Sequence, residues 1–314
     1  MPELILNERG ETILEWIIRK FLELNRKLLN KILILLGFKK TLYGILDTPC
    51  SYKASTTIKV ENYFRNCDSK TYRLLEWESG NESDEASIFL EEDDETIGLH
   101  DHLKDKLKIS MKQIKAYHYL ICLVEGRRSR KYDSTNNEHE EKLYELWELL
   151  KENEKLEGRR SKQWEEIGFQ GNDPATDFRG MGILGLEQLI YYAKNDTKSC
   201  LRFLHLSQHP TKGFPFAICG ITISYIAKEL LNRGHLKRHF YNNIIYPREI
   251  NIDDFNDVYI KLFNLFSDYW FFCGDNRNIM NFNIVKEEFI DIIQKYCSKD
   301  NANLNLCYSM KDVY

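Results

Sequence analysis

Apolar residues recur at spacings of three and four in most long segments of the chain, and this pattern constrains the fold more than any other feature. It is clearest in residues 103–124, 143–150, 183–193 and 255–266, where one face of a helix would be apolar. The sequence shows no alternation of the kind that marks strands joined by hairpin turns. We therefore expect an all-α fold, built as a single multi-helix domain with an N-terminal amphipathic helix.

The N-terminal region, residues 1–40, carries the longest amphipathic pattern, over residues 11–38. Between residues 11 and 40 there are seven basic and three acidic side chains. A basic amphipathic helix binds anionic membrane surfaces, and an amphipathic helix of any charge can instead pack on its own domain. The sequence leaves both interpretations open, so peripheral membrane contact through residues 11–38 is one of two expectations.

Residues 41–119 are expected to form a helical extension interrupted by an acidic loop. Residues 76–95 hold ten acidic side chains and no basic one. Such a segment cannot bury enough apolar surface to fold by itself, so we expect an exposed loop there.

Charge and cysteine content restrict the class of protein. The net charge is −4, which argues against a nucleic-acid partner, because such proteins are usually strongly basic. Eight cysteines are scattered singly without a C-x-x-C pair, which favours free thiols in the reducing cytoplasm. The sequence shows neither a signal-peptide pattern nor an uncharged apolar run of the roughly 18 residues that a spanning helix needs. A cytoplasmic location is the expectation.

Residues 164–192 have a composition that core packing and solvation alone do not explain. Five of the chain's sixteen glycines fall between Gly168 and Gly185. Asp173-Pro174 starts a turn, and Arg179 follows an aromatic residue and precedes a glycine. The sequence predicts a tight loop that presents Arg179 immediately before a helix with a buried face.

The neighbours of Arg179 have expected supporting roles. Trp164 and Phe178 are expected to hold the loop by packing, and Gly180 and Gly182 to leave its backbone accessible. Asp177 can either cap the helix that follows or orient Arg179, and we favour the cap.

Helix caps are expected at several further positions along the chain. Asn136 or Asn137 and Ser161 precede helical segments, and Gly168 stands where a helix-ending glycine would. Asp253 or Asp254 is expected to cap the helix that contains residues 255–266.

Other motifs have weaker support as functional sites. Residues 180–185 match G-x-G-x-x-G, but a loop precedes them where a dinucleotide fold needs a strand. The pairs His205/His209 and His235/His239 lack the glutamate of a H-E-x-x-H metal motif. No cofactor or metal is therefore expected. By composition, four other arginines compete with Arg179 as candidates for a functional arginine: Arg127, Arg128, Arg159 and Arg160.

A long run of residues resembles the ELMO (engulfment and motility) family. The run is W-E-E-I-G-F-Q-G-N-D-P at residues 164–174, followed by T-D-F-R-G-M-G-I-L-G-L at residues 176–186. The resemblance implies a domain over residues 120–298, leaving residues 299–314 as a C-terminal tail. Long members of the family are scaffolds with added domains, and this chain is similar to the short members.

The resemblance also implies a function. Short members act as GTPase-activating proteins on Arf and Arl GTPases, and the arginine of the D-F-R-G segment, here Arg179, is the implied catalytic residue. The partner would be the GTP-bound form of an Arf or Arl GTPase, which carries its own nucleotide and Mg²⁺. The alternative is a non-catalytic GTPase-binding or scaffold module. A third class, a hydrolase with a substrate pocket of its own, has no constellation of residues that supports it.

Overall fold

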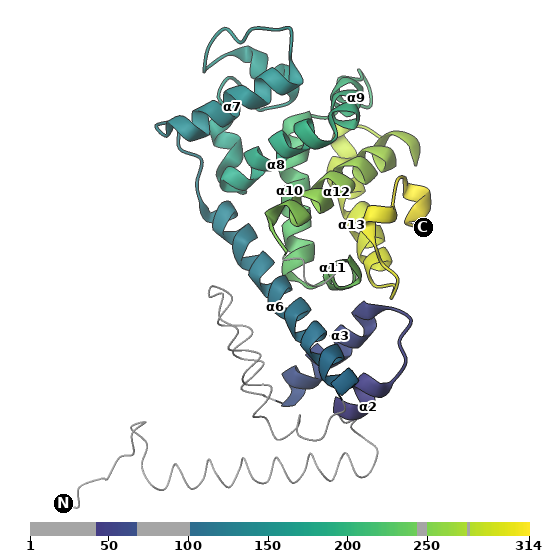
Figure 1. Ribbon diagram of the computed structural model, residues 1–314. Helices are drawn as coiled ribbons and strands as arrows, with labels where there is room; N and C mark the ends of the chain where they lie inside the picture. Colours follow the sequence, from purple (N-terminus) through teal and green to yellow (C-terminus); the bar gives the residue numbers. More distant parts are fainter. Residues whose placement is uncertain (1–41, 68–100, 244–249, 275–276) are drawn as a thin grey trace, which may run out of the picture.

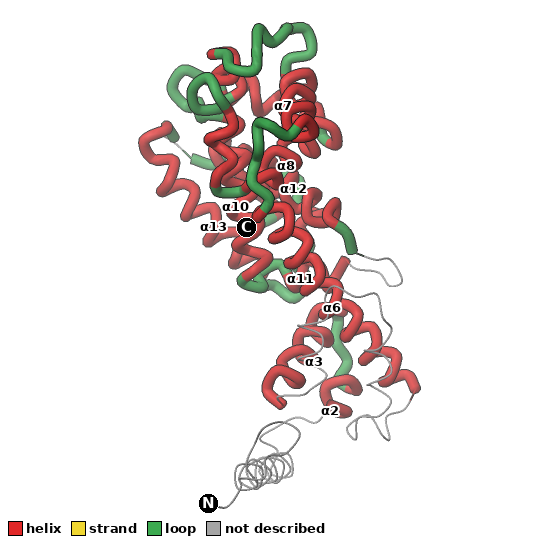
Figure 2. The backbone as a smooth tube through the Cα atoms, turned by 90° about the vertical axis from the view of Figure 1, so that its left-hand side faces the viewer, coloured by secondary structure: helices red, strands yellow, loops and turns green. Residues whose placement is uncertain are grey.

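Helices joined by loops make up the described part of the protein. The computed structural model describes residues 42–67, 101–243, 250–274 and 277–314. Within these ranges no strand occurs, and Figure 2 shows helices joined by loops, so the all-α prediction is confirmed. The predicted helix at residues 11–38 and the predicted acidic loop at residues 76–95 lie outside the described ranges.

The described residues form a series of α-helices with short 3-10 helices among them. In order they are α2 (Leu42–Asp47), α3 (Lys53–Cys67), α6 (Asp101–Ser129), α7 (Asn137–Leu150), α8 (Gly182–Asn195), α9 (Thr197–Ser207), α10 (Phe216–Asn232), α11 (Lys237–Asn243), α12 (Ile252–Phe272) and α13 (Phe282–Cys297). Short 3-10 helices stand between or after them: η1 (Lys162–Ile167), η2 (Pro174–Arg179), η3 (Ile279–Asn281), η4 (Leu304–Leu306) and η5 (Met310–Asp312).

Helix α8 lies at the centre of the main domain. It packs against α6, α7, α9, α10 and α12, which surround it in Figure 1. Its sequence is apolar on nearly every side, with Ile183, Leu184 and Leu186 all buried. A narrow stripe with Glu187, Tyr191 and Lys194 is at least partly exposed. A helix with such a wide apolar face is stable only when other elements enclose it, so the position of α8 follows from its composition. The loop that precedes α8 is therefore attached to the best-buried helix of the fold.

Helix α6 connects the N-terminal lobe, defined as α2 and α3, to the rest of the domain. Figure 1 shows it running from α2 and α3 at one end to the neighbourhood of α7 and α8 at the other. Buried polar contacts join the lobe and α6 to α10 and α11. The Tyr117 hydroxyl donates to the Leu231 carbonyl at 2.6 Å, and Gln113 Nε2 donates to the Tyr241 carbonyl at 2.8 Å. Glu61 of α3, almost fully buried, pairs with Lys237 of α11.

The caps predicted at Asn136 and Ser161 are confirmed, and the cap predicted for α12 is wrong. Asn136 accepts a hydrogen bond from the Glu138 amide at the start of α7, and Ser161 accepts one from the Gln163 amide at the start of η1. Asp253 and Asp254 do not cap α12. The cap is Asn251, which accepts from both of their amides, while the Asp254 carboxylate accepts from the Asn251 amide in return. The helix thus starts earlier, because a reciprocal capping box satisfies one more amide than a single cap.

Residues 299–314 lie against the domain. Leu304, Cys307, Met310 and Val313 are buried. The Asp268 carboxylate of α12 accepts a hydrogen bond from the Met310 amide at 2.8 Å. The C-terminal segment therefore contributes to the core.

Candidate functional site

The loop from Gly168 to Gly182 is fixed at both ends by close backbone contacts. Gly168 has φ +86°, and a Cβ there would lie 2.1 Å from the Phe216 nitrogen at the start of α10. Gly182 has φ +56°, and a Cβ there would lie 2.3 Å from the Arg128 carbonyl oxygen at the end of α6. The Ile183 amide donates to the Arg130 carbonyl at 2.8 Å. Only glycine permits this conformation and this proximity at both positions, so the loop is held against two helices.

Arg179 is the last residue of η2, and its side chain is exposed. Its Nε donates to the Thr176 carbonyl one turn earlier, at 2.8 Å. No ion pair to Arg179 occurs among the residues that the structure describes. A Cβ on the following residue, Gly180, would meet no atom within 4 Å. Beyond the bond from Nε, the guanidinium is thus available to a second molecule.

Asp173 is the N-cap of η2 and connects this short helix to Arg159. One carboxylate oxygen accepts from the Ala175 amide at 3.0 Å and lies 2.9 Å from Arg159 Nη1. Partial burial opposes ionisation of Asp173, but the Ala175 amide and the Arg159 guanidinium outweigh it and hold the pKa below its usual range. Asp173 is therefore an ionised cap, whereas the sequence predicted only a turn at Asp173-Pro174.

A row of aromatic side chains lies beneath the loop. Phe178 is buried and stacks on Tyr132 with ring centres 5.2 Å apart. Phe169 contacts Phe178 on one side and Trp164 on the other, edge to face. Trp164 is fully buried, and its indole N–H donates to the Arg159 carbonyl at 3.0 Å. The structure thus places Trp164 and Phe178 in the core below Arg179.

The expected helix cap at Asp177 is wrong. Its carboxylate accepts a hydrogen bond from the Gln170 amide at 2.9 Å, across the loop, whereas α8 begins after Met181 with no side-chain cap. Helix α8 needs none at that point because its second amide, from Ile183, already bonds to Arg130. Burial raises the pKa of Asp177 above its usual value, and the Gln170 amide and Arg179 offset this only in part.

The competing arginines are engaged differently from Arg179. Arg127 pairs with Glu187 of α8, and Arg128 pairs with Glu125 within α6. Arg159 is largely buried between Glu140 and Asp173. Arg160 is 76% exposed and lies 3.4 Å from Asp173. Sequence composition could not separate these arginines, because the partners of Arg127 and Arg159, Glu187 and Glu140, lie far away along the chain.

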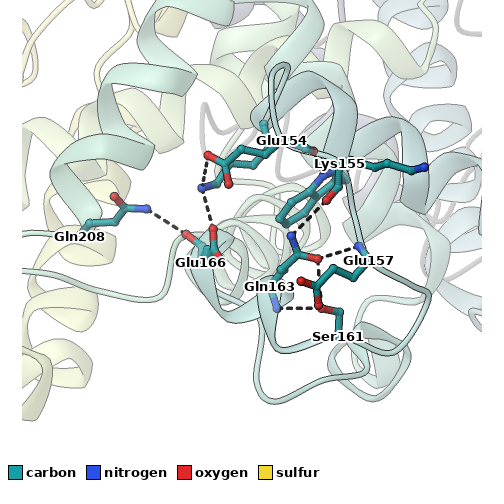
Figure 3. A network of polar contacts seen from close by, with 9 residues as sticks. Glu154, Lys155, Glu157, Ser161, Gln163, Glu166 and Gln208 are labelled. Carbon is teal, nitrogen blue, oxygen red and sulfur yellow. Dashed lines mark hydrogen bonds and ion pairs between the residues drawn. The ribbon is translucent and has the colours of Figure 1, made fainter.

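A shallow hollow of about 480 Å³ opens beside the loop, and sequence reasoning missed it. Figure 3 shows the polar network around it. Gln163 bridges the neighbouring segment by donating to the Lys155 carbonyl and accepting from the Glu157 amide. The lining mixes both charges: Glu157, Gly158, Arg160, Ser161, Lys162, Gln163, Glu166 and Asn172. No nucleophile–base pair or metal-ligand cluster occurs in it, and the described residues elsewhere contain no metal-ligating group of three.

The two histidine pairs and the G-x-G-x-x-G match at residues 180–185 contribute to the fold, through hydrogen bonds and backbone packing. His239 is buried, and its Nδ1 accepts a hydrogen bond from the Leu304 amide at 3.1 Å. His209 Nδ1 accepts from the amides of the turn that follows it. The residues before Gly180 form the 3-10 helix η2, where a dinucleotide fold would have a strand. In the described part of the chain, no helix has both the length and the apolar composition needed to cross a bilayer.

Comparison with known proteins gives one consistent family. The profile of the ELMO/CED-12 family matches residues 122–286. The chain is 42% identical to human ELMO domain-containing protein 2 over 200 residues, which are 64% of this chain and 67% of that protein. It is 39% identical to mouse ELMO domain-containing protein 1 over 275 residues, 81% of this chain and 82% of that protein. It is 37% identical to ELMO domain-containing protein B of Dictyostelium discoideum over 180 residues, 57% of this chain and 61% of that protein. With its helical domain and its Gly-rich loop inside the matched range, the chain belongs to the ELMO/CED-12 family.

Proposed function

We propose that this protein is a GTPase-activating protein for an Arf or Arl GTPase, and that Arg179 acts in trans as its arginine finger. The observation that carries the proposal is the combination at Arg179 of an exposed guanidinium with a loop fixed at both ends. The resemblance of the D-F-R-G segment to the short ELMO members supports it. The nucleotide and Mg²⁺ belong to the partner.

The chemistry requires a cation at the transferring phosphoryl group. Negative charge accumulates on the phosphoryl oxygens during GTP hydrolysis, and a guanidinium placed among them stabilises that charge. Arginine fingers in well-studied GTPases raise kcat by roughly 10³–10⁵, which corresponds to about 4–7 kcal/mol. Arg179 has its guanidinium nitrogens other than Nε available for this contact.

The anchored loop supports catalysis by reducing the cost of orientation. A side chain on a mobile loop loses conformational entropy when it enters the partner's site. Here Gly168 packs on α10 and Gly182 on α6, while Phe178 is buried directly before Arg179. The backbone of the finger is therefore in place before the partner binds, and only the Arg179 side chain has to be ordered.

The test is single-turnover GTP hydrolysis by a panel of Arf and Arl GTPases, with wild-type protein and with Arg179→Lys and Arg179→Ala. Lysine keeps the charge but loses the planar fork, so both variants are expected to lose stimulation by about two orders of magnitude or more. Thermal stability should change by about 0.5 kcal/mol or less, because the side chain is exposed. Arg160→Lys and Arg160→Ala are matched controls at an exposed arginine beside the same loop.

Two results would contradict the proposal. If Arg179→Lys stimulates hydrolysis as well as the wild type, Arg179 is not the finger. If the wild type binds GTP-loaded partners from the panel and stimulates none of them, the protein is a non-catalytic GTPase-binding or scaffold module.

A further inference from the structure

Arg159 is a largely buried cation between two carboxylates from different parts of the chain. Its side chain is 20% exposed. Nε pairs with Glu140 of α7, and Nη1 lies 2.9 Å from Asp173 at the start of η2. The pairing joins α7, the segment before η1, and η2 at one point.

A second set of contacts leads from Arg159 to the other end of η2. The guanidinium carbon lies 6.0 Å from the centre of the Tyr132 ring. The Tyr132 hydroxyl donates to Glu140, the same carboxylate that Arg159 contacts. The Tyr132 ring stacks on Phe178, the residue immediately before Arg179. Arg159 is thus connected to η2 at its first turn through Asp173 and at its last turn through Tyr132 and Phe178.

The short helix η2 needs such external contacts. It has six residues in 3-10 geometry, which is too short to be stable without tertiary contacts. Its N-terminal amide is satisfied by Asp173, and the orientation of Asp173 is set by the ion pair with Arg159. The direction in which Arg179 leaves the surface therefore depends on where Asp173 and Phe178 are held.

We propose that Arg159 is a positioning residue for the Arg179 loop. By pairing with Asp173 and Glu140, it fixes η2 on α7 and so sets the direction of the Arg179 side chain. This inference rests on the proposed function in one respect, namely that the position of Arg179 matters for GTP hydrolysis.

The neighbouring arginine gives a matched comparison. Arg160 pairs with the other oxygen of the same carboxylate, at 3.4 Å, but is 76% exposed. An exposed ion pair is screened by water and contributes little to order. Arg160 is therefore expected to be replaceable, although it adjoins Arg159 and shares its partner.

The first test is steady-state kinetics of GTP hydrolysis on the responsive GTPase with Arg159→Lys, Asp173→Asn and the control Arg160→Lys. Lysine cannot contact both carboxylates in the fork geometry. Asparagine keeps an oxygen for the Ala175 amide but loses the charge. For the first two variants we expect kcat to fall by about 10- to 100-fold with KM unchanged, because a misplaced catalytic group costs rate and leaves binding intact. Arg160→Lys should match the wild type.

The second test does not depend on activity. Hydrogen–deuterium exchange of peptides spanning residues 170–182 should be faster in Arg159→Lys than in the wild type, while peptides from α10 and α12 stay unchanged. The folded fraction from circular dichroism is measured alongside. If Arg159→Lys does not fold, Asp173→Asn provides the same two measurements from the other side of the pair.

The outcomes separate the two proposals. Wild-type kcat together with wild-type exchange in Arg159→Lys overturns the positioning role, as does a loss of kcat that equals the loss of folded fraction. A different outcome is faster local exchange in Arg159→Lys together with a wild type that stimulates no GTPase. This outcome supports Arg159 as the residue that holds the loop and contradicts the proposed function.

Discussion

Gly180 and Gly182 stand two residues apart beside Arg179 and have different physical reasons to be glycine. Gly182 has a left-handed backbone, and a Cβ there would collide with the carbonyls of Arg128 and Arg130. Gly180 has φ −81°, a value open to any residue, and a Cβ there would meet nothing within 4 Å. Gly182 is thus needed for folding, whereas Gly180 leaves the surface beside Arg179 open to a partner.

Gly182→Ala is expected to destabilise the protein by about 2 kcal/mol or more, from backbone strain together with the clash on α6. Gly180→Ala should stay within about 0.5 kcal/mol of the wild type. Urea unfolding of the two variants tests this. Equal stabilities would show that α6 moves away freely from the loop, contrary to the packing described above.

For single residues, the sequence predicted that Arg179 is presented by a loop, but it did not predict the residues that hold this loop. The Gly-rich surroundings of Arg179 are a local signal, and so is the Asp173-Pro174 turn. The pairing of Arg159 with Glu140 is not local, because nineteen positions separate the two residues. The predicted helix cap at Asp177 was wrong because its hydrogen-bond partner, the Gln170 amide, lies across the loop. Such a contact leaves no periodic pattern in the sequence.

Among the elements, α11 and the C-terminal segment show how a single buried histidine joins two parts of the chain. His239 of α11 accepts a hydrogen bond from the Leu304 amide through Nδ1, which requires the nitrogen to be unprotonated. Burial lowers the pKa of His239 from the usual 6.5 to about 4, and Asp254 opposes this only in part. The docking of residues 299–314 is therefore sensitive to acid.

The sign of the effect follows from the two pKa values. Between pH 6.5 and about 4 the unfolded chain binds a proton at this histidine and the folded protein does not, so stability falls as the pH is lowered through this range. His239 alone should contribute about 3 kcal/mol at pH above 6.5 that is lost by pH 4. In His239→Gln, whose amide oxygen can accept the same hydrogen bond, the pH dependence of urea unfolding should flatten. The exposed His205→Gln is the control, and an equally steep profile in His239→Gln would contradict the assignment.

The existence of the helices could be predicted, because the signals for a helix, its apolar spacing and its caps, lie within the same short stretch of sequence. The starts of α7 and η1 follow from Asn136 and Ser161 in this way. The burial of residues 299–314 was not predictable from periodicity. Their contacts come from single apolar side chains on 3-10 turns, such as Leu304 and Met310, that pack against α12.

At the level of the whole molecule, the sequence allows two roles for residues 1–40, membrane contact and packing on the domain. Their basic amphipathic pattern favours an anionic membrane surface, where a GTPase partner would be met at high local concentration. The structure describes the chain from Leu42, which starts the N-terminal lobe. Peripheral membrane binding through residues 11–38 is a proposal at this scale.

Deletion of residues 1–40 is expected to weaken co-sedimentation with anionic liposomes, because the basic amphipathic segment is removed. The proposed GTPase stimulation in solution should be unchanged, since the loop from Gly168 to Gly182 is outside the deleted segment. Liposomes of neutral lipid serve as the control. If the shortened protein is insoluble, the segment belongs to the core and the membrane proposal loses its support. If the shortened protein binds liposomes as well as the full chain does, the membrane proposal is wrong.

Helix α6 spans the distance between the N-terminal lobe and the loop that carries Arg179 (Figure 1). At about 1.5 Å per residue its 29 residues measure about 43 Å, from the N-terminal lobe to the carbonyls that touch Gly182. The distance and the direction from the lobe to Arg179 are therefore set by the length of α6 together with the packing of α3 on α11. Seven residues inserted into α6 would lengthen it by about 10 Å and turn its two ends by only about 20° relative to each other, whereas two residues would turn them by about 200°. Either insertion would separate α3 from α11, where Glu61 pairs with Lys237.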